Sequence, residues 1–146
     1  MAEDTVDKAI EVCGLPKRKC VTKKFRIHGY RKNPDLTDHM YVYGSDEPKI
    51  LRLIEQEPAL GEKLSQKFGY TLAEVVWAVR EEMAITLEDV LSRRVRLLFV
   101  DAREAIAAAP KAAAIMAREL GRDQAWIDEQ VKNFTDVAKN YIFEQK

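Results

Sequence analysis

Residues 71–100 read TLAEVVWAVREEMAITLEDVLSRRVRLLFV, and this stretch decides the fold. Thr71 followed by Glu74 matches a capping box, in which two side chains satisfy free backbone N–H groups at a helix start. Apolar side chains then recur at helical spacing and line one face: Leu72, Val75, Val76, Val79 and Met83. Thr86 with Asp89 repeats the start signal, and Leu87, Val90 and Leu91 supply a second apolar stripe. The stretch therefore predicts two helices in tandem at the centre of a helical domain.

The charged residues of this stretch favour a structural role. Glu81 and Glu82 are adjacent, so on a helix they point about 100° apart and cannot work as a paired acid and base on one face. Arg93, Arg94 and Arg96 follow the second stripe, where cations stabilise a helix end. We interpret Glu82 as a partner of nearby arginines. Anion binding by the arginines is the alternative.

The sequence before residue 71 predicts two further helices. Residues 1–13 carry an apolar face and are stopped by Gly14 and Pro16, but they hold too little apolar surface to fold alone. Residues 38–44 are aromatic and are expected to pack loosely. Ser45 or Asp46 begins the next helix, which ends at residues 57–58, where glutamate precedes proline. For residues 59–70 the periodicity does not choose between a short helix and a tucked loop.

The sequence after residue 100 predicts a helix start at Asp101 and a run of nine alanines between residues 102 and 117. Pro110 is expected to break this run into two helices, because proline lacks an N–H and clashes with the preceding turn. Gly121 is a stop signal, and Asp123 begins a last helix of about five turns. Trp77 and Trp126 lie on or beside apolar stripes and are predicted to be core or interface residues. The predicted fold class is all-α: a compact bundle of five or six helices with a basic, partly extended N-terminal arm.

The basic arm is residues 17–32, which hold eight basic residues and no acidic one. Since the whole chain carries 24 basic and 24 acidic residues, the remainder has a net charge of −8. Residues 20–28 alternate apolar and polar side chains, so an extended strand or hairpin arm is one interpretation. A solvated linker facing an acidic neighbour is favoured over a site for nucleic acid, phosphate or acidic lipid, because a charge block alone is weak support for binding.

Composition and motifs exclude several classes of function. The chain has 146 residues, of which 47% are hydrophobic and 33% charged, typical of one globular, soluble domain. No stretch is apolar enough to span a bilayer, and no secretory signal begins the chain. Cys13 and Cys20 are predicted to be reduced cysteines of a cytoplasmic protein, and His28 and His39 to be ordinary polar or loop residues. No phosphate-binding glycine loop, nucleophile motif or zinc motif is present, so we assign no catalytic, cofactor-binding or metal-binding residue.

The central stretch resembles the C-terminal helical domain of flavin-dependent glycerol-3-phosphate dehydrogenases and alpha-glycerophosphate oxidases. The shared pattern is E-V-x-W-A-x-R-x-E-M-A-x-T-x-E-D-V-L-x-R-R. It is matched by Glu74, Val75, Trp77, Ala78, Arg80, Glu82, Met83, Ala84, Thr86, Glu88, Asp89, Val90, Leu91, Arg93 and Arg94. The resemblance extends through AAPKAAAIMARELG and DQAWIDEQVKNF and, more weakly, back to residues 20–22 and 27–29. It therefore covers most of the chain.

The resemblance implies a division of the chain. In the family a flavin-contacting G-G-K-x-T-T-Y-R segment is followed by a helix similar to residues 1–7. Residues 1–16 are therefore expected to be the last helix of a truncated flavin domain, residues 17–44 a basic linker or arm, and residues 45–146 the C-terminal helical domain. The FAD-binding glycine motif, the substrate-binding arginines and the catalytic histidine of the family lie upstream. No catalytic or flavin-contacting role is carried over to a residue here.

The resemblance also implies a function for the parent protein. A bacterial parent is expected to oxidise sn-glycerol 3-phosphate to dihydroxyacetone phosphate, passing hydride to FAD and electrons to quinone, or to oxygen in the oxidase branch. The present chain is expected to be structural and inactive, to bind no FAD and no nucleic acid, and to contact the upstream flavin and substrate domains of the same protein. Homodimerisation, and placement of the parent at the inner face of the membrane, are left open. The alternative is a stand-alone helical module that binds another protein.

Overall fold

The computed structural model describes residues 1–143, and throughout this range the regular elements are helices, with no β-strand. The elements follow the chain in the order α1 (Ala2–Val12), η1 (His39–Asp46), α2 (Glu47–Gln56), η2 (Pro58–Gly61), α3 (Leu72–Glu81), η3 (Asp89–Arg94), α4 (Leu97–Val100), α5 (Ala102–Leu120) and α6 (Gln124–Lys139). The predicted all-α fold class is confirmed. Residues 20–28 do not form the strand that their alternation allowed, because they have no neighbouring strand with which to pair.

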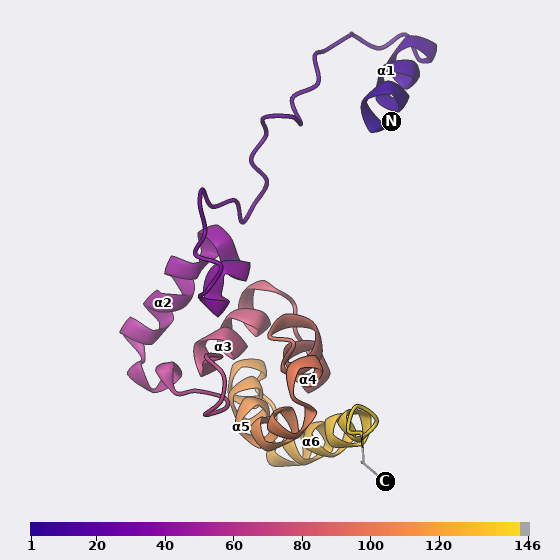
Figure 1. Ribbon diagram of the computed structural model, residues 1–146. Coiled ribbons are helices and arrows are strands. Elements are labelled where there is room, and N and C mark those ends of the chain that lie inside the picture. The colour runs from indigo at the N-terminus through magenta and orange to yellow at the C-terminus, as the bar shows by residue number, and fades with distance from the viewer. Residues whose placement is uncertain (144–146) are drawn as a thin grey trace.

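The helical bundle comprises the elements from η1 to α6, and α5 is at its centre. α3, α4 and α6 all pack against α5, while α2 contacts η1, η2 and α3. Figure 1 shows α1 held away from this bundle by a long irregular segment, and none of its residues is buried. α1 therefore lacks the packing partner that its apolar face requires, as its sequence predicted.

The helix starts follow the predicted caps. The backbone N–H of Thr71 donates to Glu74 Oε2 at 2.6 Å, and Thr71 and Glu74 form the expected capping box of α3. Asp101 accepts from two backbone N–H groups at the start of α5, and Asp123 accepts from the N–H of Trp126 at the start of α6. Gly121 ends α5 with a φ of 63°, a left-handed conformation that glycine adopts without steric cost.

Pro110 does not break its helix, so this prediction was wrong. α5 runs without interruption from Ala102 to Leu120, with Pro110 exposed on its surface. The alanine face beneath it is fully buried: Ala105, Ala109, Ala112 and Ala113 have no exposed surface. Such small side chains let α5 lie close to its neighbours. Tertiary packing therefore outweighs the local cost of a proline inside the helix.

The second half of the central stretch also departs from the prediction. The Thr86–Asp89 capping box forms, with Asp89 Oδ2 accepting from Thr86 N at 2.9 Å and Thr86 Oγ1 accepting from Asp89 N at 3.2 Å. The element that follows is a six-residue π-helix, η3, rather than a regular α-helix. It buries Val90, Leu91 and Ser92, and the wider turn brings Val90 and Leu91 into the same core. Arg96 then adopts a left-handed conformation that starts α4.

Residues 39–44 pack more tightly than their sequence predicted. η1 buries Met40, Tyr43 and Gly44, and both large side chains belong to the hydrophobic core cluster. The residues between 59 and 70 resolve into the short η2 and a loop whose ends pair as an isolated bridge between Lys63 and Thr71. η1 packs against α2, and η2 packs against both α2 and α3. The division of the chain into residues 1–16, 17–44 and 45–146 stays a prediction.

Candidate functional site: the joint between arm and bundle

We define the joint as the turn at residues 28–31 together with residues 38–49, where the basic arm meets the bundle. His28 Nε2 lies 2.6 Å from Asp46 Oδ2, and Arg31 forms an ion pair with Glu47. The backbone N–H of Ser45 donates to the carbonyl oxygen of Gly29 at 3.2 Å. These contacts attach the end of the arm to the N-terminal end of α2.

Two glycines allow this close approach. Gly44 has a φ of 53°, and a Cβ placed on it would lie 1.8 Å from the carbonyl oxygen of Gly29. Because the obstructing atoms are backbone, no side-chain adjustment would relieve the clash. Gly29 itself has a φ of 83°. The joint therefore depends on glycine at residue 44, for both conformation and space.

A small polar pocket of about 210 Å³ lies beside the joint. Its lining comprises His28, Asp46, Lys49, Trp77, Glu81 and Glu82. Lys49 Nζ donates to Asp46 Oδ1 at 2.7 Å, and Lys49 together with His28 holds the pKa of the Asp46 carboxyl below its usual range. Lys49 and Asp46 thus form an ion pair, with His28 within hydrogen-bond distance of the same carboxylate, rather than an array of free catalytic groups.

Glu74 lies at the centre of a second cluster, on the α3 side of the joint. Its side chain is 1% exposed, and its Oε2 accepts from Thr71 N, from Thr71 Oγ1 and, at 3.2 Å, from His39 Nε2. Its Oε1 accepts from the Tyr43 hydroxyl at 3.1 Å. Burial raises the pKa of Tyr43, and the nearby Glu74 charge adds to the effect. A buried carboxylate needs such donors, because it has lost the water that would otherwise solvate it.

His39 was predicted to be an ordinary polar or loop residue, and the structure gives it a more specific place. It is the first residue of η1, and it joins the linker to a buried carboxylate 35 residues later. The capping box at Thr71 revealed Glu74 as a helix-start residue. No sequence signal revealed that His39 and Tyr43 reach the same carboxylate, since such long-range contacts leave no periodic pattern.

The charged residues singled out after α3 take the structural roles expected of them. Arg94 donates to the backbone carbonyl of Glu82 at 2.6 Å, and its Nε lies 3.4 Å from Glu82 Oε2. Burial raises the pKa of Glu82, while Arg94 opposes that rise. Arg93 pairs with Glu88 and Asp89 at the surface. Trp77 is buried and Trp126 packs against the core, as predicted.

We expect Arg94→Ala to lower the free energy of unfolding by about 1–2 kcal/mol. The substitution removes a charged hydrogen bond to a backbone carbonyl, and it leaves the partly buried Glu82 carboxylate without its counter-charge. Thermal unfolding followed by circular dichroism measures the change. Arg93→Ala is the matched control and should cost less than about 0.5 kcal/mol, because its ion pairs are exposed. An unchanged melting temperature for Arg94→Ala would contradict the structural role and favour an interdomain or functional role for Arg94.

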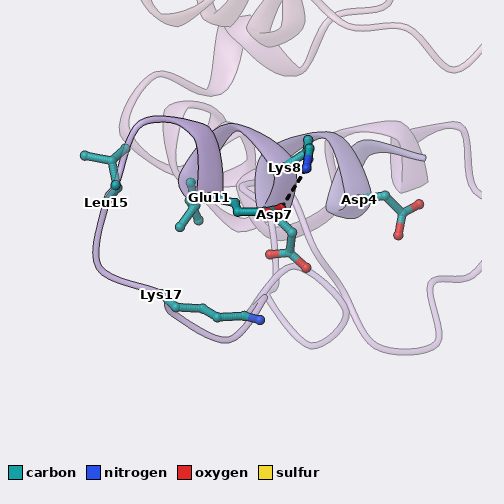
Figure 2. A pocket seen from close by; sticks show the side chains of 8 residues that line it. Asp4, Asp7, Lys8, Glu11, Leu15 and Lys17 are labelled. Carbon is teal, nitrogen blue, oxygen red and sulfur yellow. Dashed lines mark hydrogen bonds and ion pairs between the residues drawn. The ribbon is translucent and has the colours of Figure 1, made fainter.

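The α1 region carries shallow pockets with mixed polar and apolar linings. Figure 2 shows one of about 560 Å³, lined by Asp4, Asp7, Lys8 and Glu11 of α1 and by Lys17 from the start of the arm. Lys8 pairs with Glu11 at 2.9 Å, and the labelled carboxylates project from the exposed face of the helix. Cys13 and Cys20 are both exposed and unpaired with each other. Nothing in this arrangement resembles a catalytic constellation.

The described residues were also compared with the requirements of a metal site and of a membrane-spanning helix. Residues 1–143 contain no cluster of three or more His, Cys, Asp or Glu side chains suited to a metal ion. Over the same described range, no helix is both long and apolar enough to cross a membrane.

Comparison with known proteins decides the family. The sequence model of a family described as the C-terminal domain of alpha-glycerophosphate oxidase matches residues 20–127. The chain belongs to this family. The family match thus covers most of the arm, the joint and most of the bundle, while α1 lies outside the matched range. The resemblance of residues 74–94 is confirmed.

Relatives of the chain carry consistent names. It is 31% identical to a probable mitochondrial glycerol-3-phosphate dehydrogenase of Caenorhabditis elegans, over 97% of this chain and 22% of the relative. It is 26% identical to glycerol-3-phosphate dehydrogenase 2 of Mycobacterium bovis, over 99% of this chain and 28% of the relative. The human mitochondrial glycerol-3-phosphate dehydrogenase is 25% identical over 98% of the chain. No solved structure matches the chain. The chain thus corresponds to between a fifth and a third of each of these relatives.

Proposed function

We propose that this chain is the C-terminal accessory domain of a flavoprotein that oxidises sn-glycerol 3-phosphate to dihydroxyacetone phosphate. The observation that carries the proposal is the family match over residues 20–127, combined with relatives named glycerol-3-phosphate dehydrogenase that are several times longer. Hydride passes to FAD in the parent, and quinone is the proposed electron acceptor. Oxygen is the alternative acceptor, in keeping with the family description.

The residues of this chain do not fit an FAD site. A dinucleotide site presents backbone N–H groups at a glycine-rich helix start, where the helix dipole favours a pyrophosphate. The pocket in Figure 2 is lined instead by the carboxylates of Asp4, Asp7 and Glu11 and by only two lysines, Lys8 and Lys17, so its charged lining is net negative. The pocket at the joint has a volume of only about 210 Å³, and Asp46, Glu81 and Glu82 contribute carboxylates to its lining. We therefore assign FAD, the substrate and the catalytic residues to the upstream part of the parent.

The proposed partners of this chain are the upstream flavin and substrate domains. α1 supports this assignment, because the helix has an apolar face with Val6, Ala9 and Ile10, yet none of its residues is buried in the described chain. The arm then leads from α1 to the joint, where its end is fastened to α2. In this arrangement the chain acts by packing rather than by chemistry, and the eight arm cations face acidic neighbours rather than nucleic acid.

We expect the purified 146-residue chain to be colourless and inactive. Its visible absorbance spectrum should show no flavin band, and it should not reduce an artificial electron acceptor when supplied with glycerol 3-phosphate. The positive control is the protein translated from the full open reading frame. Extension of that frame upstream into a segment resembling G-G-K-x-T-T-Y-R supports the accessory-domain role, whereas a stop codon there supports a stand-alone interaction module. A flavin band or turnover in the short chain would overturn the assignment.

A further inference from the structure

His39 lies in a socket built for an imidazole ring. A Cβ on Gly69 would lie 2.6 Å from His39 Nδ1, so the ring rests on bare backbone at that residue. The Tyr70 ring meets it edge to face, with centroids 5.3 Å apart. The side chain of His39 is only 28% exposed. A loop from one side and η1 from the other thus hold the ring in one place.

Both nitrogens of this ring face carboxylates. Nε2 lies 3.2 Å from Glu74 Oε2, and Nδ1 lies 3.4 Å from Asp38 Oδ1. A neutral imidazole has one N–H and donates in one direction, whereas the imidazolium ion donates from both nitrogens. The arrangement is therefore complementary to the cation. Loss of the proton removes one donor and leaves the buried Glu74 charge with neutral partners alone.

The neighbouring carboxylates also favour the protonated ring, whereas burial and one nearby lysine oppose protonation. The hydrogen bond to Glu74 raises the pKa of His39, the charges of Glu74 and Asp38 add to the rise, and burial and Lys63 oppose it. Tyr43 and Tyr70 contribute neutral rings beside Glu74 and His39. A histidine whose pKa is raised on folding stabilises the folded state fully below its unfolded pKa of roughly 6.5. That contribution is lost as the pH rises through the folded value.

We propose that His39 is a proton-dependent latch that holds η1, and with it the joint, on α3. With the ring protonated, it bridges Asp38 of the linker to Glu74 of the bundle. With the ring neutral, the bridge is incomplete and η1 opens more readily. The opening releases the joint at residues 28–31, because Ser45 and Asp46, which bond to Gly29 and His28 of that turn, are part of η1. The latch is a property of this chain and does not depend on the proposed function of the parent.

Hydrogen exchange tests the latch in the whole chain. We expect the protection factors of amides 39–46, corrected for intrinsic exchange rates, to fall between about pH 5.5 and about pH 8.5 in the wild type, since this interval spans the ordinary histidine pKa of roughly 6.5. In His39→Gln, which keeps a neutral donor, that fall should disappear. Serine replaces Cys13 and Cys20 in every variant, so that thiol ionisation and disulfide exchange do not contribute. Amides in the middle of α5 report global unfolding for comparison.

Two control variants distinguish the titration of His39 from the loss of a hydrogen bond to Glu74 that does not depend on pH. Tyr43→Phe removes a neutral donor from the same carboxylate, so it should lower protection of η1 equally at every pH. His28→Gln removes the other histidine, whose side chain is 80% exposed, and should keep the wild-type pH dependence. A pH dependence that persists in His39→Gln, or that follows His28, would overturn the proposal.

A direct titration keeps the proposal falsifiable if His39→Gln unfolds. NMR titration of the ring should give His39 a pKa above the ordinary histidine value in the wild type. Gly69→Ala, which displaces the ring from its socket, should move that pKa back towards the ordinary value. A wild-type His39 pKa at or below roughly 6.5 would overturn the latch.

Discussion

Pro110→Ala is expected to raise the free energy of unfolding by roughly 2–3 kcal/mol. Pro110 is exposed in the middle of α5, where a proline removes one helical hydrogen bond and crowds the preceding turn. Alanine restores the N–H donor and has the highest helix propensity. The gain is reduced by up to about 1 kcal/mol, since proline also restricts the unfolded chain. The measurement is urea-induced unfolding followed by far-UV circular dichroism.

A second proline provides the control for this experiment. Pro48 lies in the first turn of α2, where its missing N–H has no helical acceptor to lose. Pro48→Ala should therefore change the stability by less than about 1 kcal/mol in either direction. If Pro110→Ala left the stability unchanged or lowered it, α5 would not be continuous through residue 110 in solution.

Glu74→Ala should be strongly destabilising, by about 3 kcal/mol or more. The substitution leaves the Thr71 N–H, the Tyr43 hydroxyl and the His39 ring without their shared acceptor. It also opens a small cavity beneath η1, since Glu74 is 1% exposed. Urea unfolding gives the loss, and hydrogen exchange at residues 39–46 shows whether η1 detaches before the bundle unfolds.

Two further variants separate the effect of burial from that of helix capping. Glu74→Gln keeps one carbonyl acceptor and should cost less than Glu74→Ala. Asp89→Ala removes the equivalent residue of the second capping box, where the side chain is 21% exposed. It should cost about 1 kcal/mol, the ordinary value for a helix cap. Equal losses for Asp89→Ala and Glu74→Ala would show that capping, and not the buried network, accounts for the role of Glu74.

Much of the fold could be predicted from local sequence signals. The capping boxes at Thr71 and Thr86, the caps at Asp101 and Asp123 and the stop at Gly121 all form as expected, because each depends on groups within four residues of one another. The match of residues 74–94 to the family could also be recognised directly, because it rests on residue identities. The absence of catalytic and cofactor residues stays a prediction for the parent to test.

The wrong predictions share one cause: local sequence signals do not include the free energy of tertiary packing. Pro110 is tolerated because the alanines around it are buried where α5 packs against its neighbouring helices. Val90 and Leu91 enter the core through a π-helix rather than an α-helix, which periodicity cannot distinguish over six residues. The joint shows the same limit, because contacts such as His39 with Glu74 span 35 residues.

The sequence by itself determined the helical class, the helix starts and the family, because capping chemistry, apolar periodicity and motif identity are all local in the chain. Only the tertiary structure decided that α5 is continuous, that Gly44 admits the turn at Gly29, and that His39 and Tyr43 meet Glu74. These outcomes depend on which surfaces become buried together. Burial removes water from a carboxylate and makes its remote partners indispensable, and no local pattern records where that happens.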